Sequence, residues 1–412
     1  MASLAQHPYV RLARNRGFSL LWTGQLVSLF GDRIHQTAMV MLVVSFGSSS
    51  IAMAAVWLAA FLPAVIVGPA LGAWVDRVDQ RRVLIGMDIA RAIMVAFIPL
   101  VATISFWLTV PILVALGVAS AAFSPARFAV VARTVDHEDL VTASASMMLG
   151  ETVADLIGYP LAGLIVVLLA AQLRMAFYID AASYMVSALA ITAAGIGRRP
   201  EVLGSALDSA EAGVGAAWNF LRHETVLFAN TMQGVVGQVA SGVFWVMMPL
   251  YATGFIALSS NIAPGAAYGT LQTGIGVGCL VGGFIIGGMG HLVKKGYLVT
   301  AGYVSTGLLI VAFALTGSIV LSFLIVVGGG VANMAYVIPS QALFGARVPD
   351  AMMARVVAIR SALVSSAYVV GITCAGALGD HFGIAAVMIA FGLFEAATGL
   401  VGLLSPSVRS AD

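Results

Sequence analysis

The sequence is short of charged residues. Only 9% of its 412 residues are Asp, Glu, Lys or Arg, and 60% are hydrophobic, whereas soluble domains carry about 25% charged residues. A water-soluble protein of this composition would have too few polar side chains to cover its surface. The composition therefore excludes a soluble globular protein and requires a lipid bilayer as the solvent for most of the chain.

Cysteine, net charge and basic clusters are also scarce. The two cysteines, Cys279 and Cys374, lie inside apolar segments without the spacing of a metal site, so we expect free thiols and no bound metal. The net charge is +2, and no basic run or basic patch with interleaved aromatic residues occurs. Nucleic acid is therefore not expected as a partner.

The apolar segments lack the alternation of a membrane strand. Barrel strands alternate apolar and polar residues over roughly 10 residues, whereas these segments stay apolar for about 20 residues or more. Because backbone groups in lipid must be paired internally, we expect helices. The sequence predicts an all-α integral membrane protein with 12 transmembrane helices. The predicted spans are residues 17–46, 51–75, 83–105, 108–132, 140–169, 173–197, 224–253, 265–290, 297–316, 318–343, 354–379 and 383–404.

The basic residues indicate the orientation of these spans. Apart from Arg174, those in the connecting segments and tails lie on one side of the predicted spans, which the positive-inside rule makes cytosolic. Both termini then lie in the cytosol. The connections on the opposite side are very short, except at roughly residues 254–264.

One long polar connection separates six predicted spans from six. The spacing of its residues predicts a short amphipathic helix on the cytosolic membrane face. The residues that support this prediction are Ser205, Asp208, Ala212, Val214, Trp218 and Leu221. The expected organisation is a cytosolic segment 1–16, an N-terminal half 17–197, a linker 198–223, a C-terminal half 224–404 and a cytosolic tail 405–412.

Ionisable residues inside membrane helices are costly and therefore mark functional candidates. In the first predicted span, Asp32, His35 and Gln36 follow the i, i+3, i+4 spacing of one helix face. Arg33 points elsewhere and is expected to need an acidic partner of its own. Further along, Asp88 and Arg91 have the i, i+3 spacing of an intrahelical ion pair near the cytosolic interface.

The fifth and sixth predicted spans carry three more acids. Glu151 and Asp155 lie one turn apart, and no base is evident beside them. Two carboxylates so close in a low-dielectric site cannot both ionise cheaply, which is typical of a proton carrier. Asp180 follows in the sixth span, with Tyr184 one turn on. The alternative is that these acids are structural and pair with arginines. The predicted proton-coupling and substrate site consists of Asp32, His35, Gln36, Glu151, Asp155 and Asp180.

The second half of the sequence is poorer in charge inside its spans, where Arg360 and Glu395 occur. Its other polar groups are neutral, and we expect them to form the rest of a substrate wall. They are Gln233, Gln238, Gln272, Asn333, Tyr336 and Gln341.

A short turn between the second and third spans concentrates charge. It reads Gly72-Ala-Trp-Val-Asp76-Arg77-Val-Asp79-Gln80-Arg81-Arg82-Val-Leu84. The turn resembles the signature loop of the major facilitator superfamily, Gly-x-Leu-Ala-Asp-Arg-x-Gly-Arg-Arg-x-x-Leu. It departs from that loop where Asp79 replaces a glycine and Gln80 replaces an arginine. The resemblance implies two six-helix halves around a midplane site, with Asp76 and Arg127 forming a breakable latch on the cytosolic side.

Other motifs are similar to those of exporters in this superfamily. The fifth span resembles the antiporter motif, which ends Gly-Pro-x-x-Gly, although Tyr159 replaces the glycine before proline. The motif positions in this sequence are Gly150, Gly158, Pro160 and Gly163. Three stretches resemble the macrolide-efflux and enterobactin-exporter-like branch: Gly24-Gln25-x-x-Ser28-x-x-Gly31-Asp32, Phe177-Tyr-Ile-Asp180-Ala-Ala-Ser183, and Val348-Pro349-Asp350 followed by Arg355-Val356.

The buried acids and the resemblance together predict a proton-coupled secondary active exporter of amphipathic small molecules, working by alternating access. The proton motive force replaces any cofactor, and the expected partners are the substrate, protons and the lipid bilayer. The resemblance implies a monomer in the inner membrane of a prokaryote. A lipid or lysophospholipid flippase and a siderophore or metal-ion exporter are the alternatives. An enzyme is not expected, because Gly-x-Ser-x-Gly and His-Glu-x-x-His motifs are absent.

Overall fold

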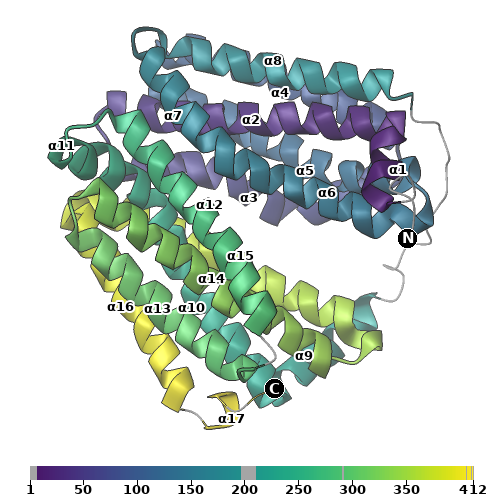
Figure 1. Cartoon of the computed structure of the whole chain (residues 1–412), viewed down its shortest axis with the longest axis vertical. Coiled ribbons are helices and arrows are strands. Elements are labelled where there is room, and N and C mark those ends of the chain that lie inside the picture. The colour runs from purple at the N-terminus through teal and green to yellow at the C-terminus, as the bar shows by residue number, and fades with distance from the viewer. Residues whose placement is uncertain (1–6, 196–209, 290–291, 405, 410, 412) are drawn as a thin grey trace. The chain divides into compact units, whose positions relative to one another are not determined.

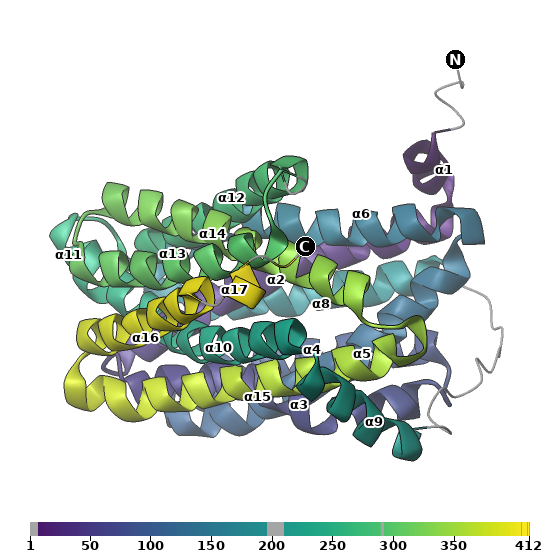
Figure 2. The ribbon, with the colours of Figure 1, turned by 90° about the horizontal axis from the view of Figure 1, so that it is seen from below.

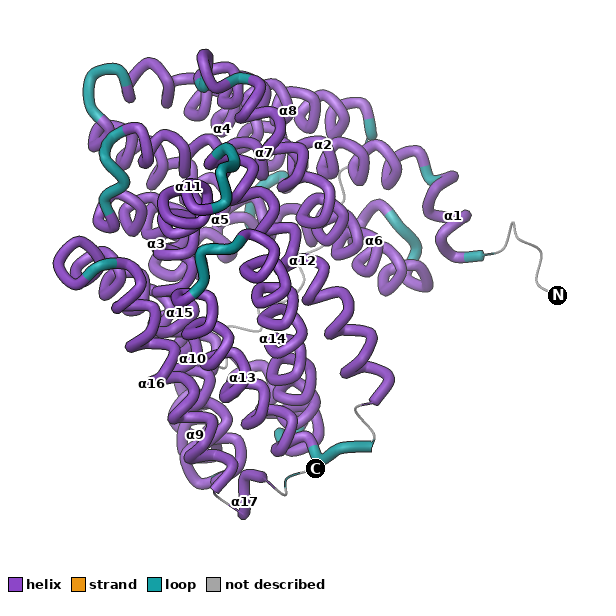
Figure 3. The backbone as a smooth tube through the Cα atoms, turned by 60° about the vertical axis from the view of Figure 1, so that its left-hand side comes forward, coloured by secondary structure: helices purple, strands orange, loops and turns teal. Residues whose placement is uncertain are grey.

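The structure is a computed structural model that describes residues 7–195, 210–289, 292–404, 406–409 and 411. All of the regular elements in this part of the chain are helices, and it contains no strand (Figure 3). The expected all-α fold is therefore confirmed. The outer parts of the predicted tails and most of the predicted linker, including Ser205 and Asp208, lie outside the described residues.

Eleven helices among the described residues are long and apolar enough to cross a membrane. The remaining predicted span, residues 17–46, corresponds to α2 (Arg16–Ser45), which is 30 residues long. A helix of that length spans roughly 45 Å, more than the hydrocarbon core needs. Its hydropathy is lowered by the polar residues between Asp32 and Gln36, the same residues that mark it as a functional candidate.

The chain packs as two compact units, and each has its own core. The first unit comprises Met1–Gly47 and Ala55–Val202, and the second comprises Ser48–Ala54 and Leu203–Asp412. The helices of the first unit, besides α2 and short 3-10 turns, are α1 (Pro8–Arg14), most of α3 (Ser50–Val75), α4 (Gln80–Ala102), α5 (Thr109–Thr134), α6 (Leu140–Val153), α7 (Tyr159–Leu168) and α8 (Arg174–Ala193). Helices α2, α4 and α8 lie side by side (Figure 1).

The predicted fifth span is not one continuous helix. It consists of α6, a wide π-helical turn η4 (Ala154–Gly158) and α7. Pro160 stands at the start of α7 and has no backbone N–H, so it removes one hydrogen bond from the helical ladder. The wide turn absorbs this defect, as π turns do in membrane helices. The span predicted over 140–169 is therefore interrupted by a π turn next to the predicted acids, just before Pro160.

The helices of the second unit follow the predicted order with one correction. They are α9 (Ala210–His223), α10 (Thr225–Tyr251), α11 (Ala257–Ser259), α12 (Pro264–Met289), α13 (Lys295–Leu315), α14 (Ile319–Arg347), α15 (Asp350–Phe382), α16 (Ile384–Leu404) and α17 (Pro406–Arg409). The connection expected at 254–264 is shorter, because α10 continues through a second π turn, η6 (Ala252–Ile256), into α11. Pro249 lies just before that turn.

Helix α9 lies where the amphipathic helix was predicted. Ala217 and Leu221 are fully buried, and α9 packs against α15 and α10, beside which it lies in Figure 2. Val214 and Trp218, one turn apart, remain exposed. One stripe of this helix thus packs on its own unit, while a second apolar pair stays uncovered.

Glycines allow the closest approach between helices of the second unit. A Cβ atom on Gly278 of α12 would overlap the carbonyl oxygen of Val327 on α14. A Cβ atom on Gly330 would lie 2.6 Å from the backbone nitrogen of Cys279. Small residues at such contacts let membrane helices pack backbone to backbone, which supplies the dispersion energy that replaces the hydrophobic effect in lipid.

This packing predicts a position-specific effect on stability. The variant Gly278→Ala is expected to lower the thermal unfolding temperature of the purified protein, because overpacking costs about 1–3 kcal/mol. Gly283→Ala on the same helix is the control, since its Cβ atom would meet nothing within 4 Å. That variant is expected to match the wild type. Equal unfolding temperatures for the two variants would contradict the close approach at Gly278.

Candidate functional site

The polar residues of α2 face two different neighbours. The hydroxyl of Tyr184 on α8 donates a hydrogen bond to Asp32 Oδ1 at 2.5 Å. One turn further, Nδ1 of His35 lies 3.4 Å from Oδ2 of Asp180, also on α8. Asp180 is fully buried, and its Oδ1 accepts a hydrogen bond from Ser183 at 3.2 Å. Asp32 and His35 therefore share the face of α2 that contacts α8, as predicted from their spacing.

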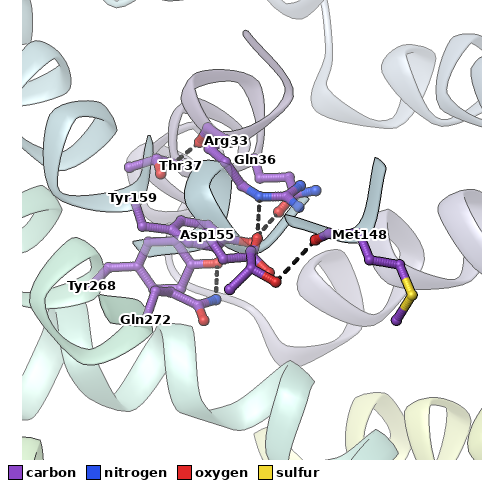
Figure 4. Close-up of polar contacts among 9 residues, drawn as sticks. Arg33, Gln36, Thr37, Met148, Asp155, Tyr159, Tyr268 and Gln272 are labelled. Atoms are coloured by element: carbon purple, nitrogen blue, oxygen red, sulfur yellow. Dashed lines mark hydrogen bonds and ion pairs between the residues drawn. The ribbon is translucent and has the colours of Figure 1, made fainter. Parts of the chain in front are cut away.

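Arg33 and Gln36 contact the broken fifth span instead (Figure 4). Nε of Arg33 lies 2.7 Å from Oδ1 of Asp155, which confirms that Arg33 has an acidic partner of its own. The hydroxyl of Tyr159 donates to Oε1 of Gln36 at 2.6 Å, and the Arg33 guanidinium lies 5.3 Å from the centre of the Tyr159 ring. Gln36 was expected to act together with Asp32 and His35, but its side chain contacts α7 rather than α8.

Glu151 also has a basic partner. Its Oε1 lies 2.9 Å from Nη2 of Arg127 on α5. The expectation that Glu151 and Asp155 lack a nearby base was therefore wrong, because the two bases come from α5 and α2 and are distant in sequence. The side chains of both acids are 42–43% exposed, whereas those of Arg33 and Arg127 are 15% exposed. Each pair thus has a buried cation and a half-exposed anion.

The π turn and the glycines of the antiporter-like motif position these ion pairs. Asp155 lies within the turn. A Cβ atom on Gly158 would lie 3.1 Å from Cγ of Arg33, and one on Gly150 would lie 3.4 Å from Nε1 of Trp22. Both glycines therefore let α2 approach the broken helix closely, which brings Arg33 within reach of Asp155. Gly163 is buried in α7.

A third arginine–carboxylate pair joins this group of residues through α4. Asp88 is bonded to Arg91, both are buried, and the predicted i, i+3 pair is confirmed. The Arg91 guanidinium lies 4.0 Å from the ring centre of Phe123 and 4.4 Å from that of Tyr184. Because Tyr184 also binds Asp32, the pair belongs to the same network. The sequence placed it at the interface and did not indicate this connection.

The acids and bases of this network do not balance. It has five carboxyl groups, on Asp32, Asp88, Glu151, Asp155 and Asp180, and three guanidinium groups, on Arg33, Arg91 and Arg127. Three acids have an arginine as direct partner. The two others, Asp32 and Asp180, contact Tyr184, Ser183 and His35. Two negative charges are therefore left uncompensated if every acid ionises, and unpaired charge at such sites is costly.

The signature loop has a structural role in the first unit. Arg81 Nη2 donates to the backbone oxygen of Thr192 at the end of α8, at 2.7 Å. Arg82 lies 3.5 Å from Asp79, which caps α4. Gln80, the departure from the family pattern, accepts from Arg133 at 2.7 Å. The loop thus ties the start of α4 to the ends of α5 and α8.

The structure does not show the expected latch between Asp76 and Arg127. Arg127 binds Glu151, while Asp76 and Arg77 are exposed and Gly72 has open space around its Cα atom. Arg127 lies seven residues before the end of α5 at Thr134, or roughly 10 Å deeper in the helix. Helix depth therefore explains why an acid on the fifth span, and not the loop aspartate, is its partner.

The second unit contains a cavity between α10, α12, α13 and α14. Its volume is about 150 Å³. Its wall is mostly apolar: Phe244, Trp245 and Phe313 lie among aliphatic side chains, and Ser241 and Asn333 add polar groups. Of the neutral residues predicted as a substrate wall, Asn333 lines this cavity and donates to the hydroxyl of Tyr336 at 2.5 Å.

The other predicted wall residues lie elsewhere. Gln272 donates to Tyr268 at 2.7 Å and is buried, and Gln233 is buried between helices. Gln238 and Gln341 are not among the residues that line the cavity. The cavity wall is thus more apolar than the predicted set of neutral polar residues indicated.

Comparisons with known proteins agree with this architecture. The chain is 24% identical to macrolide efflux protein A of Streptococcus pyogenes over 381 residues, which cover 89% of this chain and 90% of that protein. It is 24% identical to macrolide efflux protein A of Enterococcus faecalis, covering 76% of this chain and 96% of that one. The resemblance to the macrolide-efflux branch is confirmed by these relatives.

Solved structures show the same fold. The nucleoside transporter NupG superposes with a TM-score of 0.75 at 15% identity, covering 95% of this chain and 98% of that one. A bacterial homologue of the human lysosomal transporter Spinster superposes with a TM-score of 0.71 at 17% identity, covering 96% and 98%. The family model described as "Transmembrane secretion effector" matches residues 8–411. The chain therefore belongs to the transmembrane secretion effector family of the major facilitator superfamily of membrane transporters.

Proposed function

We propose that the protein is a proton-coupled exporter of amphipathic small molecules, working by alternating access in the cytoplasmic membrane of a prokaryote, with both termini in the cytosol. The observation that carries the proposal is the excess of two carboxyl groups over arginines in the network of the first unit. Acids in excess of their bases at membrane depth bind protons. The binding and release of such protons can drive a secondary transporter.

Asp32 and Asp180 are the proton-binding groups in this proposal, and His35 is their neighbour. Asp32 is half-buried and bonded to a neutral hydroxyl. Asp180 is fully buried and faces the imidazole of His35 at 3.4 Å. Protonation of either carboxyl group removes one uncompensated negative charge, and release of the proton restores that charge. The protonation state thus changes the electrostatic energy of the site where α2 meets α8.

The ion pairs of Arg33 and Arg127 can convert this change in electrostatic energy into a change of conformation. The carboxylates of Asp155 and Glu151 are half-exposed, so water or a cationic substrate can reach them. A cation bound there competes with the arginine for the carboxylate, and a partly exposed ion pair can break where a fully buried one cannot. Breakable pairs of this kind are the bistable elements of switching proteins.

The cavity of the second unit supports an amphipathic substrate. Ligand sites are mostly apolar with a few placed polar groups, and they measure about 300–1,000 Å³ for drug-sized molecules. The cavity of about 150 Å³ is smaller, so it suits one apolar part of a substrate, such as a ring, rather than the whole molecule. The macrolide efflux relatives support export of such compounds.

The driving force is sufficient for uphill export. Moving one charge across 100 mV is worth about 2.3 kcal/mol, and each unit of pH difference adds about 1.4 kcal/mol per proton. An exchange of one proton for one substrate molecule can therefore build a gradient of about tenfold per pH unit.

The proposal predicts the effect of neutralising Asp32. In cells that express Asp32→Asn, rhodamine 6G, a fluorescent amphipathic cation, is expected to accumulate as in cells without the transporter. Wild-type cells are expected to exclude it, and a protonophore is expected to abolish this exclusion. The amide oxygen can still accept from Tyr184, so the unfolding temperature is expected to stay unchanged. Glu138→Gln, at a side chain that is 81% exposed, is the control; full export by Asp32→Asn would overturn the assignment.

The ion pair of Arg33 generates a separate prediction. Asp155→Asn leaves a largely buried guanidinium unpaired and is expected to lower both export and the unfolding temperature. The double variant Arg33→Gln/Asp155→Asn removes both charges, so it is expected to recover stability but not export. Recovery of both quantities in the double variant would show that the pair is only structural.

The cavity can be filled without disturbing the helices. Gly329 lines it, and a Cβ atom at that position meets nothing within 4 Å. Gly329→Val is expected to keep the unfolding temperature and to weaken rhodamine 6G binding to the purified protein about tenfold, equivalent to about 1.4 kcal/mol. Gly283→Val is the matched control, because it adds the same side chain in open space away from the cavity. Unchanged binding by Gly329→Val would exclude the cavity as part of the substrate site.

A further inference from the structure

Glu395 in the second unit is a buried acid that has no basic partner among the described residues. It lies near the middle of α16, eleven residues after Ile384 and nine before Leu404, or roughly 14–16 Å from either end. Its exposed fraction is 0%. Among the described residues neither of its carboxyl oxygens has a hydrogen-bond partner, and no basic side chain lies within ion-pair distance of it. This separates Glu395 from Asp88, Glu151 and Asp155, which all contact an arginine.

The neighbouring helices form a close pocket around this carboxyl group. On α10, Gly237 has no side chain, and a Cβ atom there would lie 3.4 Å from Oε1 of Glu395 and 3.0 Å from Cδ1 of Tyr303 on α13. Any larger residue at this position would therefore displace one of the two. Gln233, one turn away on α10, is 5% exposed, and among the described residues neither of its amide atoms has a partner.

The titratable groups of the surrounding helices do not compensate the charge. Helix α13 brings Tyr303, whose hydroxyl is neutral at physiological pH. Arg360 on α15 donates to Ser340 at 2.7 Å and lies 4.6 Å from the ring centre of Phe344. Arg409 on α17 is exposed. An ionised Glu395 would be a buried charge without a partner, which is among the costliest arrangements in a protein.

A chain of contacts connects Glu395 with the cavity. The rings of Tyr303 and Tyr336 stack with centroids 4.3 Å apart and planes 16° apart. Asn333 donates to the hydroxyl of Tyr336 at 2.5 Å, and Asn333 also lines the cavity. Asn333, Tyr336 and Tyr303 thus form a continuous path of contacts from the cavity wall toward the carboxyl group of Glu395.

We propose that Glu395 is a second proton-binding site, located in the second unit, and that the Tyr303–Tyr336 stack links its proton to occupancy of the cavity. The inference rests on the proposed function. In the empty unit Glu395 holds a proton. When a ligand displaces the tyrosines, water reaches the carboxyl group, the proton passes to that water and the carboxylate stays hydrated. Such linkage is reciprocal: if ligand binding releases the proton, a higher pH strengthens ligand binding by the same factor.

Infrared spectroscopy of the full-length protein in lipid nanodiscs tests the first part. The wild type and the exposed control Glu138→Gln are expected to show the C=O stretching band of a protonated carboxylic acid at neutral pH. Glu395→Gln is expected to reduce that band by the intensity of one group. Glu395→Met, which removes the polar atoms altogether, is the second variant, so that misfolding of one does not decide the result. An undiminished band in either folded variant would overturn the proposal.

Binding of rhodamine 6G to the same samples tests the linkage. The affinity of the wild type is expected to rise with pH, by at most about tenfold per pH unit for one linked proton. Glu395→Gln is expected to bind more weakly than the wild type and with a smaller pH dependence, because the amide imitates the protonated acid and removes the share of the linkage that Glu395 contributes. An unchanged pH dependence in this variant would overturn the linkage. If the carboxylic-acid band is reduced by Glu395→Gln but the wild type transports no probe, the proposed function would be contradicted while the protonation of Glu395 would stand.

Discussion

The compensation of charge inside membrane helices is the constraint on which the rest of this structure depends. An uncompensated ion at membrane depth is costly, so Arg33, Arg91 and Arg127 are each held against a carboxyl group. The helix packing serves these contacts. Glycines at Gly158 and Gly150 bring α2 close to the fifth span, and the π turn places Asp155 opposite Arg33. The architecture of the unit thus follows from where its charges must meet.

The two units meet this constraint in different ways. The first unit contains many charges, most of them in pairs, with two acids in excess. The second unit surrounds one carboxyl group, that of Glu395, with glycine, amide and tyrosine groups, and it also contains a mostly apolar cavity. In the account proposed above, the paired charges of the first unit respond to cations and protons, and the cavity of the second unit responds to the apolar part of the substrate.

The sequence was sufficient for the features that depend on composition and local spacing. The helical spans follow from unbroken apolar runs, the Asp88–Arg91 pair from its i, i+3 spacing, and the need of Arg33 for an acid from the low charge around it. The partners themselves could not be predicted. Tyr184 reaches Asp32 across 152 residues, and Arg127 binds Glu151 rather than Asp76, because pairing between helices depends on their relative depth and rotation. These quantities are set by packing and leave no signal in a single sequence.

Proton flux during substrate transport measures proton coupling directly. The purified protein would be reconstituted in liposomes that enclose a pH-sensitive dye, with rhodamine 6G added outside and no imposed pH gradient. Because the cation is exchanged for a proton, we predict that its uptake acidifies the outside and raises the internal pH. We predict that the Asp32→Asn variant transports no protons. Movement of rhodamine 6G with no change in internal pH would contradict proton coupling.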